Sequence, residues 1–301
     1  MCKKIFSIIA AVLSLMFFSC SKKNALPAPS VKGSENVRIT ATFYPVYIML
    51  LNITDSVPGT QVSLLAPPNT GCLHDYQLTT KDMKAIAECD ILVANGAGME
   101  DFLDKAMEAR KGQLIQAAEG YTLIEDNPHV WVSPDGAAYE TLRIAQQLAS
   151  LDKKNADSYL KNAQEYVQKI TDLSKKMHAS LDKYAGTKII TFHEAFPYFT
   201  KEFALTQAGT IEREPGTEPT AKELAEIISL IKQAASSGEK IALFAEPQYS
   251  SGAATVIAQE TGLKVYELDP AVTGELDKDA YLKAMETNLK VLETAFTGAA
   301  Y

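Results

Sequence analysis

The sequence predicts an α/β protein with two parallel-sheet lobes that are joined by a long rigid helix. Short β-rich apolar runs alternate with helical patterns up to residue 135 and again from residue 187, and the segment between them is helical only. Strand and helix in alternation build a parallel sheet with helices on both faces. Two such lobes imply a cleft between them, where the carboxyl ends of parallel strands gather ligands.

The first residues have the pattern of an export signal. Lys3 and Lys4 precede an apolar run over 5–18, which is shorter than the roughly 20 residues that a membrane span needs. Cys20 follows a small residue, as in a lipoprotein signal, so we expect residues 1–19 to be removed and Cys20 to be lipidated. Phe17 departs from the leucine that is usual there, which leaves an uncleaved or differently cut leader as the alternative.

Structure is expected to begin after a flexible, polar tether over residues 20–35, which contains proline and has no hydrophobic period. The N-terminal lobe is assigned to residues 36–135. Its expected strands are 37–43, 61–66, 90–96 and 122–124, and its expected helices are Thr80–Glu88 and Met99–Arg110.

Two helices without an intervening strand, Gly136–Leu151 and Asn155–Tyr184, form the predicted connection over 136–186. The second has one apolar stripe at spacings of three and four, and it would be about 45 Å long. The C-terminal lobe is assigned to 187–301. Its expected strands are 188–192, 206–210, 241–245 and 264–268, and its expected helices are Ala195–Phe203, Thr220–Ser236, Ala253–Glu260 and Lys278–Phe296.

Charge and cysteine content limit the possible partners and covalent cross-links. The net charge is −8 and no basic block is present, which argues against a nucleic-acid partner. After removal of the leader and lipidation, Cys72 and Cys89 are the remaining cysteines. They could pair in an oxidising compartment or remain two half-buried thiols.

Three of the four histidines follow predicted strands, and we interpret them as metal ligands. His74, His129 and His193 lie in such loops, whereas His178 lies in the long helix and is expected to face water. Glu246 and Asp269 also follow strands. Three imidazoles and a carboxylate are a complete tetrahedral set for Zn²⁺. We therefore predict a site in the interlobe cleft with His74 and His129 from one lobe and His193 and Asp269 from the other.

Neighbouring acids leave two interpretations open. Asp75, Asp126 and Glu194 adjoin the predicted ligands and could orient the imidazoles, or they could be solvated loop acids. An exported zinc hydrolase is the rival function, with the three histidines as ligands and Glu246 or Glu194 as base. Ligation by Asp269 would close the metal shell, so we expect no enzyme activity.

Several blocks resemble the zinc and manganese solute-binding lipoproteins of bacterial ABC importers. They are FYPVY, HDYQLTTKDMKAIAECDILVANGAGMEDFL, NPHVWVSP, TFHEAFPYF, EPGTEPTAKEL and FAEPQYSSGAATVIAQETGLKVYELDP, in the order that the family has. The resemblance implies two lobes joined by a rigid helix and a metal bound by His74, His129, His193 and Asp269. Glu246 matches a cleft acid of the family whose direct ligation stays open.

This resemblance also implies how the protein works. A monomer held at the membrane by its lipid would carry the metal to an ABC permease, with small loop rearrangements on binding. Three imidazoles favour Zn²⁺ over Mn²⁺, which prefers oxygen-rich shells. The chain lacks the long histidine-rich loop that dedicated zinc binders carry ahead of the second histidine. A metal-binding adhesin is a further alternative.

Overall fold

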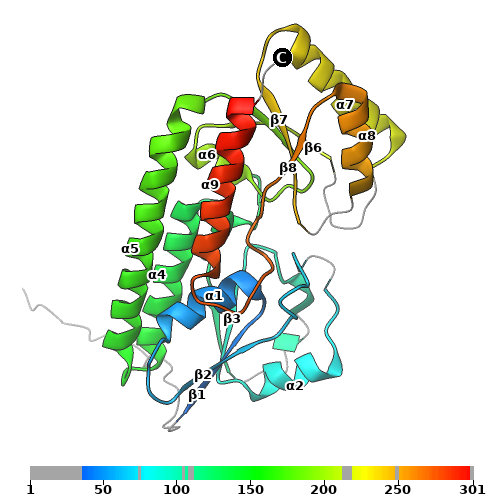
Figure 1. Ribbon diagram of the computed structural model, residues 1–301. Helices are drawn as coiled ribbons and strands as arrows, with labels where there is room; N and C mark the ends of the chain where they lie inside the picture. The colour runs from blue at the N-terminus through cyan, green and yellow to red at the C-terminus, as the bar shows by residue number, and fades with distance from the viewer. Residues whose placement is uncertain are drawn as a thin grey trace, which may run out of the picture.

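The computed structural model describes residues 36–73, 76–103, 106–107, 112–211, 219–247 and 251–298. These residues form two α/β lobes, the N-terminal lobe at the bottom of Figure 1 and the C-terminal lobe at its upper right. Each lobe contains a four-stranded parallel sheet, in the order β2-β1-β3-β4 and β6-β5-β7-β8. The predicted fold class is confirmed.

The N-terminal lobe contains one helix that the sequence pattern did not reveal. Helix α1 has a proline in its first turn and is buried around nearly its whole circumference, so it shows no amphipathic period. The elements of this lobe are β1 Val37–Ala41, α1 Tyr44–Ile53, β2 Thr60–Leu64, α2 Thr80–Glu88, β3 Ile91–Ala94, η1 Asp101–Leu103, β4 Gln113–Gln116 and η2 Val130–Val132.

The prediction of a strand at 122–124 is wrong, because the fourth strand is β4 at Gln113–Gln116. Strand β4 lies at the sheet edge and buries only Ile115, so its β pattern is weak. At Ile124 the backbone N–H donates to the Tyr198 hydroxyl (3.1 Å) in a loop. Of the predicted helix Met99–Arg110, the described residues include the single turn η1 and residues 106–107.

Three long helices run beside both lobes and connect them. They are α4 Pro134–Leu151, α5 Ala156–Leu181 with the turn η3 Asp182–Tyr184, and α9 Ala280–Gly298. At 26 residues, α5 is about 39 Å long and packs against α1, α4 and α9. Figure 1 shows α5 and α4 in green and α9 in red along one side of the molecule. We call α4, α5 and α9 the spine.

The C-terminal lobe follows the predicted alternation closely. Its elements are β5 Lys188–Thr191, α6 Pro197–Glu202, β6 Thr206–Thr210, α7 Ala221–Ser236, β7 Ile241–Ala245, α8 Ser251–Thr261 and β8 Val265–Glu267. After β8 the chain crosses to the N-terminal lobe before it returns in α9. There the Tyr44 hydroxyl donates to Glu275 O (2.8 Å) and the Asn52 amide donates to Lys278 O (2.7 Å).

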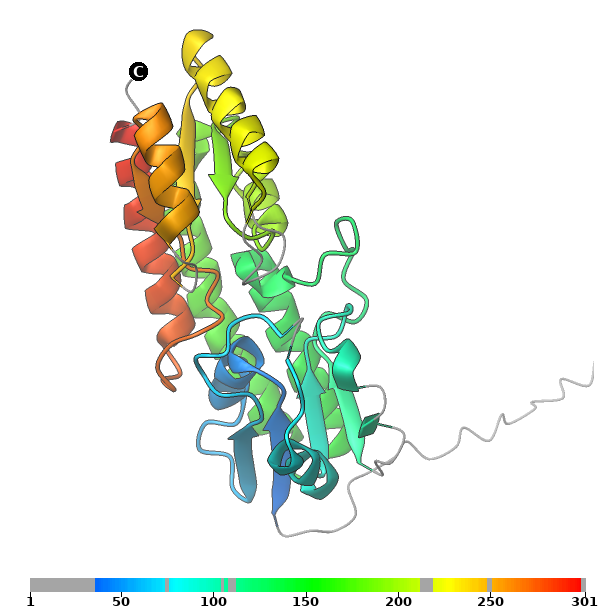
Figure 2. The ribbon, with the colours of Figure 1, turned by 90° about the vertical axis from the view of Figure 1, so that its right-hand side faces the viewer.

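One hydrophobic core extends through both lobes. It contains Ile39 from β1, Phe244 from β7 and the inward faces of the spine, with separate smaller clusters on the outer side of each sheet. Figure 2 shows the two lobes one above the other, with the spine behind them. A close-packed core resists deformation, so the spine holds the lobes in a fixed relation. No helix in the described part of the chain is both long and apolar enough to cross a bilayer.

Candidate metal centre

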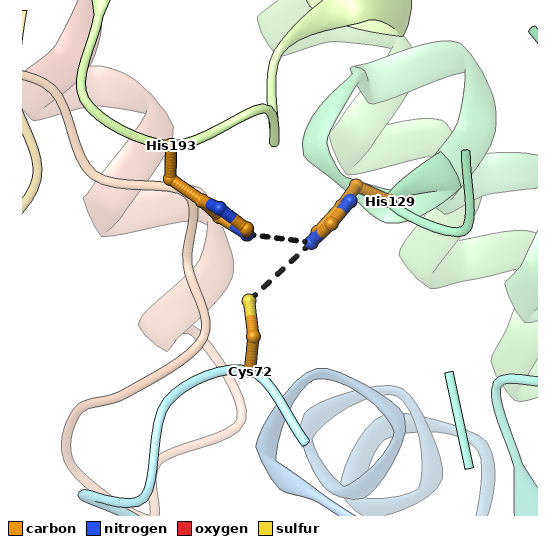
Figure 3. A group of neighbouring side chains, drawn as sticks. All are labelled: Cys72, His129 and His193. Atoms are coloured by element: carbon orange, nitrogen blue, oxygen red, sulfur yellow. Dashed lines mark hydrogen bonds between the residues drawn. The ribbon is translucent and has the colours of Figure 1, made fainter. Parts of the chain in front are cut away.

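Two histidines from opposite lobes meet in the cleft. The Nε2 atoms of His129 and His193 are 3.0 Å apart, and the rings meet edge to face with centroids 4.8 Å apart. The side chains are 0% and 1% exposed, respectively. Figure 3 shows them converging from separate loops. The structure thus brings together two of the three histidines that were predicted to bind metal.

His193 is held by the sheet of the C-terminal lobe. It lies two residues beyond β5, and its backbone carbonyl accepts a hydrogen bond from the Thr191 hydroxyl (2.8 Å). Its backbone N–H points at the carboxylate of Glu246, at 3.2 and 3.3 Å from the two oxygens. Glu246 is 2% exposed and follows β7, the neighbour of β5. The predicted cleft acid therefore contacts the loop of a predicted ligand.

His129 is oriented by Asn127. The Asn127 side-chain oxygen accepts from the His129 backbone N–H and lies 3.0 Å from His129 Nδ1. The amide nitrogen of Asn127 donates to Glu194 O (2.8 Å), which fixes which end of the amide is the oxygen. His129 Nδ1 must therefore carry the proton, since it faces an acceptor. Consequently His129 Nε2 directs its lone pair toward His193.

This loop is also anchored across the cleft. Asn127 O accepts from the Tyr198 hydroxyl (2.5 Å), and the indole of Trp131 donates to Pro270 O (3.0 Å). Trp131 is fully buried and packs edge-on against Phe43, with ring centroids 5.1 Å apart. Asn127 thus links the loop of His129 to the residue that follows His193, a role that its position two residues before His129 did not reveal.

Cys72 is a third member of the cluster that the sequence did not identify as a ligand. Its sulfur lies 3.4 Å from His129 Nε2, and the donor atoms of Cys72, His129 and His193 all lie within 4.8 Å of one another (Figure 3). Its place in the same strand-end loop as His74, two residues earlier, was the available signal. Cys72 and Cys89 are both thiols and form no disulfide with each other.

The remaining predicted residues are placed as follows. His74, Asp75 and Cys20 lie outside the described residues. Asp269 lies two residues beyond β8 and is not part of the cluster of Cys72, His129 and His193. One of its carboxylate oxygens accepts from Ala271 N (2.7 Å), and burial raises its pKa.

The fourth histidine lies in the spine. His178 is partly exposed, its Nδ1 is 2.7 Å from an Asp182 carboxylate oxygen, and its ring packs on Phe203.

A cavity of about 380 Å³ opens beside the two histidine loops. Asp126, Asn127 and Glu194 form part of its wall, together with Gln207 and Thr210 from the C-terminal lobe. Of the first three of these residues, Asn127 contacts an imidazole with its side chain, through its oxygen at His129 Nδ1. Glu194 helps to orient the His129 ring indirectly, because its backbone carbonyl accepts from the Asn127 amide that contacts the ring.

Two parallel-sheet lobes with facing imidazoles in the cleft define a bilobal metal-binding protein. The family model described as "Zinc-uptake complex component A periplasmic" (ZnuA) matches residues 39–295. The chain belongs to this family. Its curated relatives and structural neighbours carry names of zinc-uptake, zinc-binding and metal-bound solute-binding proteins.

Three relatives illustrate the similarity. The high-affinity zinc uptake system protein ZnuA of Bacillus subtilis is 29% identical over 311 residues, which cover 95% of each chain. The zinc-binding lipoprotein AdcA of Streptococcus pneumoniae is 28% identical over 97% of this chain, which spans only 60% of AdcA. The solute-binding protein FpvC of Pseudomonas aeruginosa, solved with Ni²⁺, has a TM-score of 0.79 at 27% identity, covering 88% of this chain and 98% of FpvC.

Proposed function

We propose that this protein binds a divalent transition metal in the interlobe cleft and delivers it to an ABC importer. Zn²⁺ is the preferred cargo and Mn²⁺ the alternative. The observation that supports this most directly is the buried pair of imidazoles from opposite lobes, with Nε2 atoms 3.0 Å apart. Neutral imidazole nitrogen is a ligand for zinc, and the tautomer set by Asn127 leaves His129 Nε2 available to a cation.

The proposed ligands are His74, His129, His193 and Asp269, with Glu246 as an additional cleft acid. Asp269 lies two residues beyond β8, and we propose that its loop moves on metal binding to bring a carboxylate to the imidazoles. The shared core and the spine favour such local movement over a hinge motion between lobes. Binding would therefore change the radius of gyration little.

A closed metal shell also supports transport over catalysis. Four protein ligands leave no open position for a water that a zinc hydrolase would activate. We therefore propose that the protein is not an enzyme, that it works as a monomer outside the cytoplasm, and that Cys20 anchors it to a membrane by lipid. The ABC permease would then receive the metal from the cleft.

Metal analysis and competitive Zn²⁺ and Mn²⁺ titrations of the purified protein test this function. We expect one bound metal per chain and tighter binding of Zn²⁺. His193→Ala should weaken zinc binding by at least about a hundredfold, whereas His178→Ala, in the spine, should leave it unchanged. Equal effects of the two substitutions would contradict the site. Ester or peptide hydrolysis by the zinc-loaded protein, abolished in Glu246→Gln, would support the hydrolase instead.

A further inference from the structure

We infer that Cys72 is itself a ligand of the transported metal and sets the preference of the site for zinc. This inference rests on the proposed function and exchanges one of its ligands, His74, for a sulfur donor. Among the described residues, the donor atom of Cys72 joins those of His129 and His193 in one group within 4.8 Å. Figure 3 shows its sulfur pointing at the imidazoles from below.

The distances agree with donors that share one ion. Zinc–sulfur bonds of about 2.3 Å and zinc–nitrogen bonds of about 2.0–2.1 Å, in tetrahedral geometry, separate sulfur from nitrogen by about 3.6 Å and two nitrogens by about 3.3 Å. The observed separations are 3.4 Å from Cys72 Sγ to His129 Nε2 and 3.0 Å between the two Nε2 atoms. These two pairs would need only a few tenths of an ångström of expansion around an ion, and the donor atoms of Cys72 and His193, which lie within 4.8 Å of each other, would complete the group by a small shift of the Cys72 loop.

The environment of Cys72 suits a ligand more than a core thiol. Its side chain is half-buried, so metal can reach it, and it lies beside two imidazoles that are almost completely buried. Cys89 provides the contrast within the same chain. It is 7% exposed, directly follows helix α2 as its C-cap, and packs with Ile86 and Leu92 in the outer cluster of the lobe.

A sulfur ligand changes which metal the site prefers. Thiolate is a soft donor that suits zinc, whereas manganese favours carboxylate, carbonyl and water oxygen. Cys72, His129 and His193 would supply three donors of a tetrahedral shell and Asp269 the fourth, so the thiolate would take the position that the proposed function gives to His74. Zinc would then displace the thiol proton, since thiolate is the form that ligates.

Cobalt substitution tests this ligand separately from metal binding. The proteins are wild type, Cys72→Ser and the matched control Cys89→Ser, each loaded with Co²⁺ after far-UV circular dichroism has shown that it is folded. Visible d–d absorption reports that Co²⁺ is bound, and near-ultraviolet thiolate-to-cobalt charge transfer reports a sulfur ligand. We expect both signals in wild type and Cys89→Ser, and only the visible bands in Cys72→Ser.

Competition between Zn²⁺ and Mn²⁺ gives a second measurement. Cys72→Ser should reduce the ratio of zinc to manganese affinity by at least about tenfold, and Cys89→Ser should leave the ratio unchanged. Visible bands without charge transfer in wild type would overturn the role of Cys72 while the proposed function stood. An unchanged metal ratio in Cys72→Ser would also overturn it. Absence of the visible bands from wild type would overturn both proposals.

Discussion

The two lobes share one strand order, but they present their candidate site residues in different ways. In the C-terminal lobe His193, Glu246 and Asp269 follow a strand by one or two residues. In the N-terminal lobe Cys72 lies eight residues beyond β2, and His129 thirteen residues beyond β4. The sheet therefore fixes the residues of the C-terminal lobe, whereas those of the N-terminal lobe depend on contacts made by their loops.

Trp131→Ala should have the largest effect, because it removes the main anchor of the His129 loop. Trp131 is fully buried against Phe43 and its indole N–H donates to Pro270 O. We expect a loss of about 3–5 kcal/mol in the free energy of unfolding. Urea denaturation measures this loss, and zinc titration measures the accompanying loss of affinity.

Phe244→Ala is the matched control, since it removes a fully buried aromatic residue from β7. It should lower stability comparably but reduce zinc affinity less, because the sheet still holds its site residues. Equal losses of zinc affinity in the two variants would contradict the claim that the sheet positions the C-terminal residues while loop contacts position the N-terminal ones.

Asn127→Ala should weaken zinc binding by about 10–100-fold with a small change in stability. The substitution removes the acceptor that fixes the His129 ring and the link to Glu194 O. Isothermal titration with zinc measures the effect. In the control Asn162→Ala, the lost hydrogen bonds join α5 to Ile53 O and Asp55 O, so zinc affinity should not change. An Asn127→Ala affinity within a factor of two of wild type would refute this positioning role.

The same contrast explains what could be predicted from sequence. Strands β6 and β7 and helix α2 match the predicted bounds, because their patterns are local. The structure brings His129 and His193 together, as the convergence of loops that follow parallel strands leads one to expect, and their role as ligands stays a prediction. Cys72 and Asn127 were missed because their roles depend on the path of long loops. No period in the sequence encodes such a path.

A buried glutamate in the spine, Glu140, is expected to destabilise the helix that follows the His129 loop. Helix α4 begins at Pro134, with only its N-cap Ser133 between it and η2. Glu140 is fully buried, and neither carboxylate oxygen has a hydrogen-bond partner in the described part of the chain. Burial, and then the nearby charge of Glu100, raise the pKa of Glu140 well above its usual value. Burial likewise raises the pKa of Glu100 to about 7.

The pH dependence follows from these raised pKa values. The unfolded chain releases the Glu140 proton near pH 4.5, whereas the folded protein keeps it to a higher pH. The free energy of unfolding therefore falls as pH rises above about 4.5, because the unfolded chain then binds fewer protons than the folded protein. We expect Glu140→Leu to stabilise the protein by about 1–3 kcal/mol at pH 8 and by much less at pH 4.5. Urea unfolding at both pH values measures it. Parallel pH profiles for wild type and Glu140→Leu would show that Glu140 does not titrate in this way.

The smallest expected effect comes from a matched pair of helix caps, one in each lobe. Thr79 caps α2 with Asp82, and Thr220 caps α7 with Glu223, each in a reciprocal capping box. Asp82 is 5% exposed and also accepts from the Tyr76 hydroxyl (2.9 Å), whereas Glu223 is exposed. Through Asp82, the cap of α2 also fixes Tyr76, which lies four residues after Cys72.

Thr220→Ala should cost about 1 kcal/mol of stability and Thr79→Ala up to about 2 kcal/mol. The larger cost is expected because Thr79→Ala leaves the buried Asp82 carboxylate with one donor fewer. Only Thr79→Ala should also weaken zinc binding, since α7 lies on the outer face of the C-terminal sheet, away from the histidines. Equal zinc affinities in the two variants would show that the Cys72 loop keeps its place without the cap. The dependence of the N-terminal site residues on loop contacts would then be confined to Asn127 and Trp131.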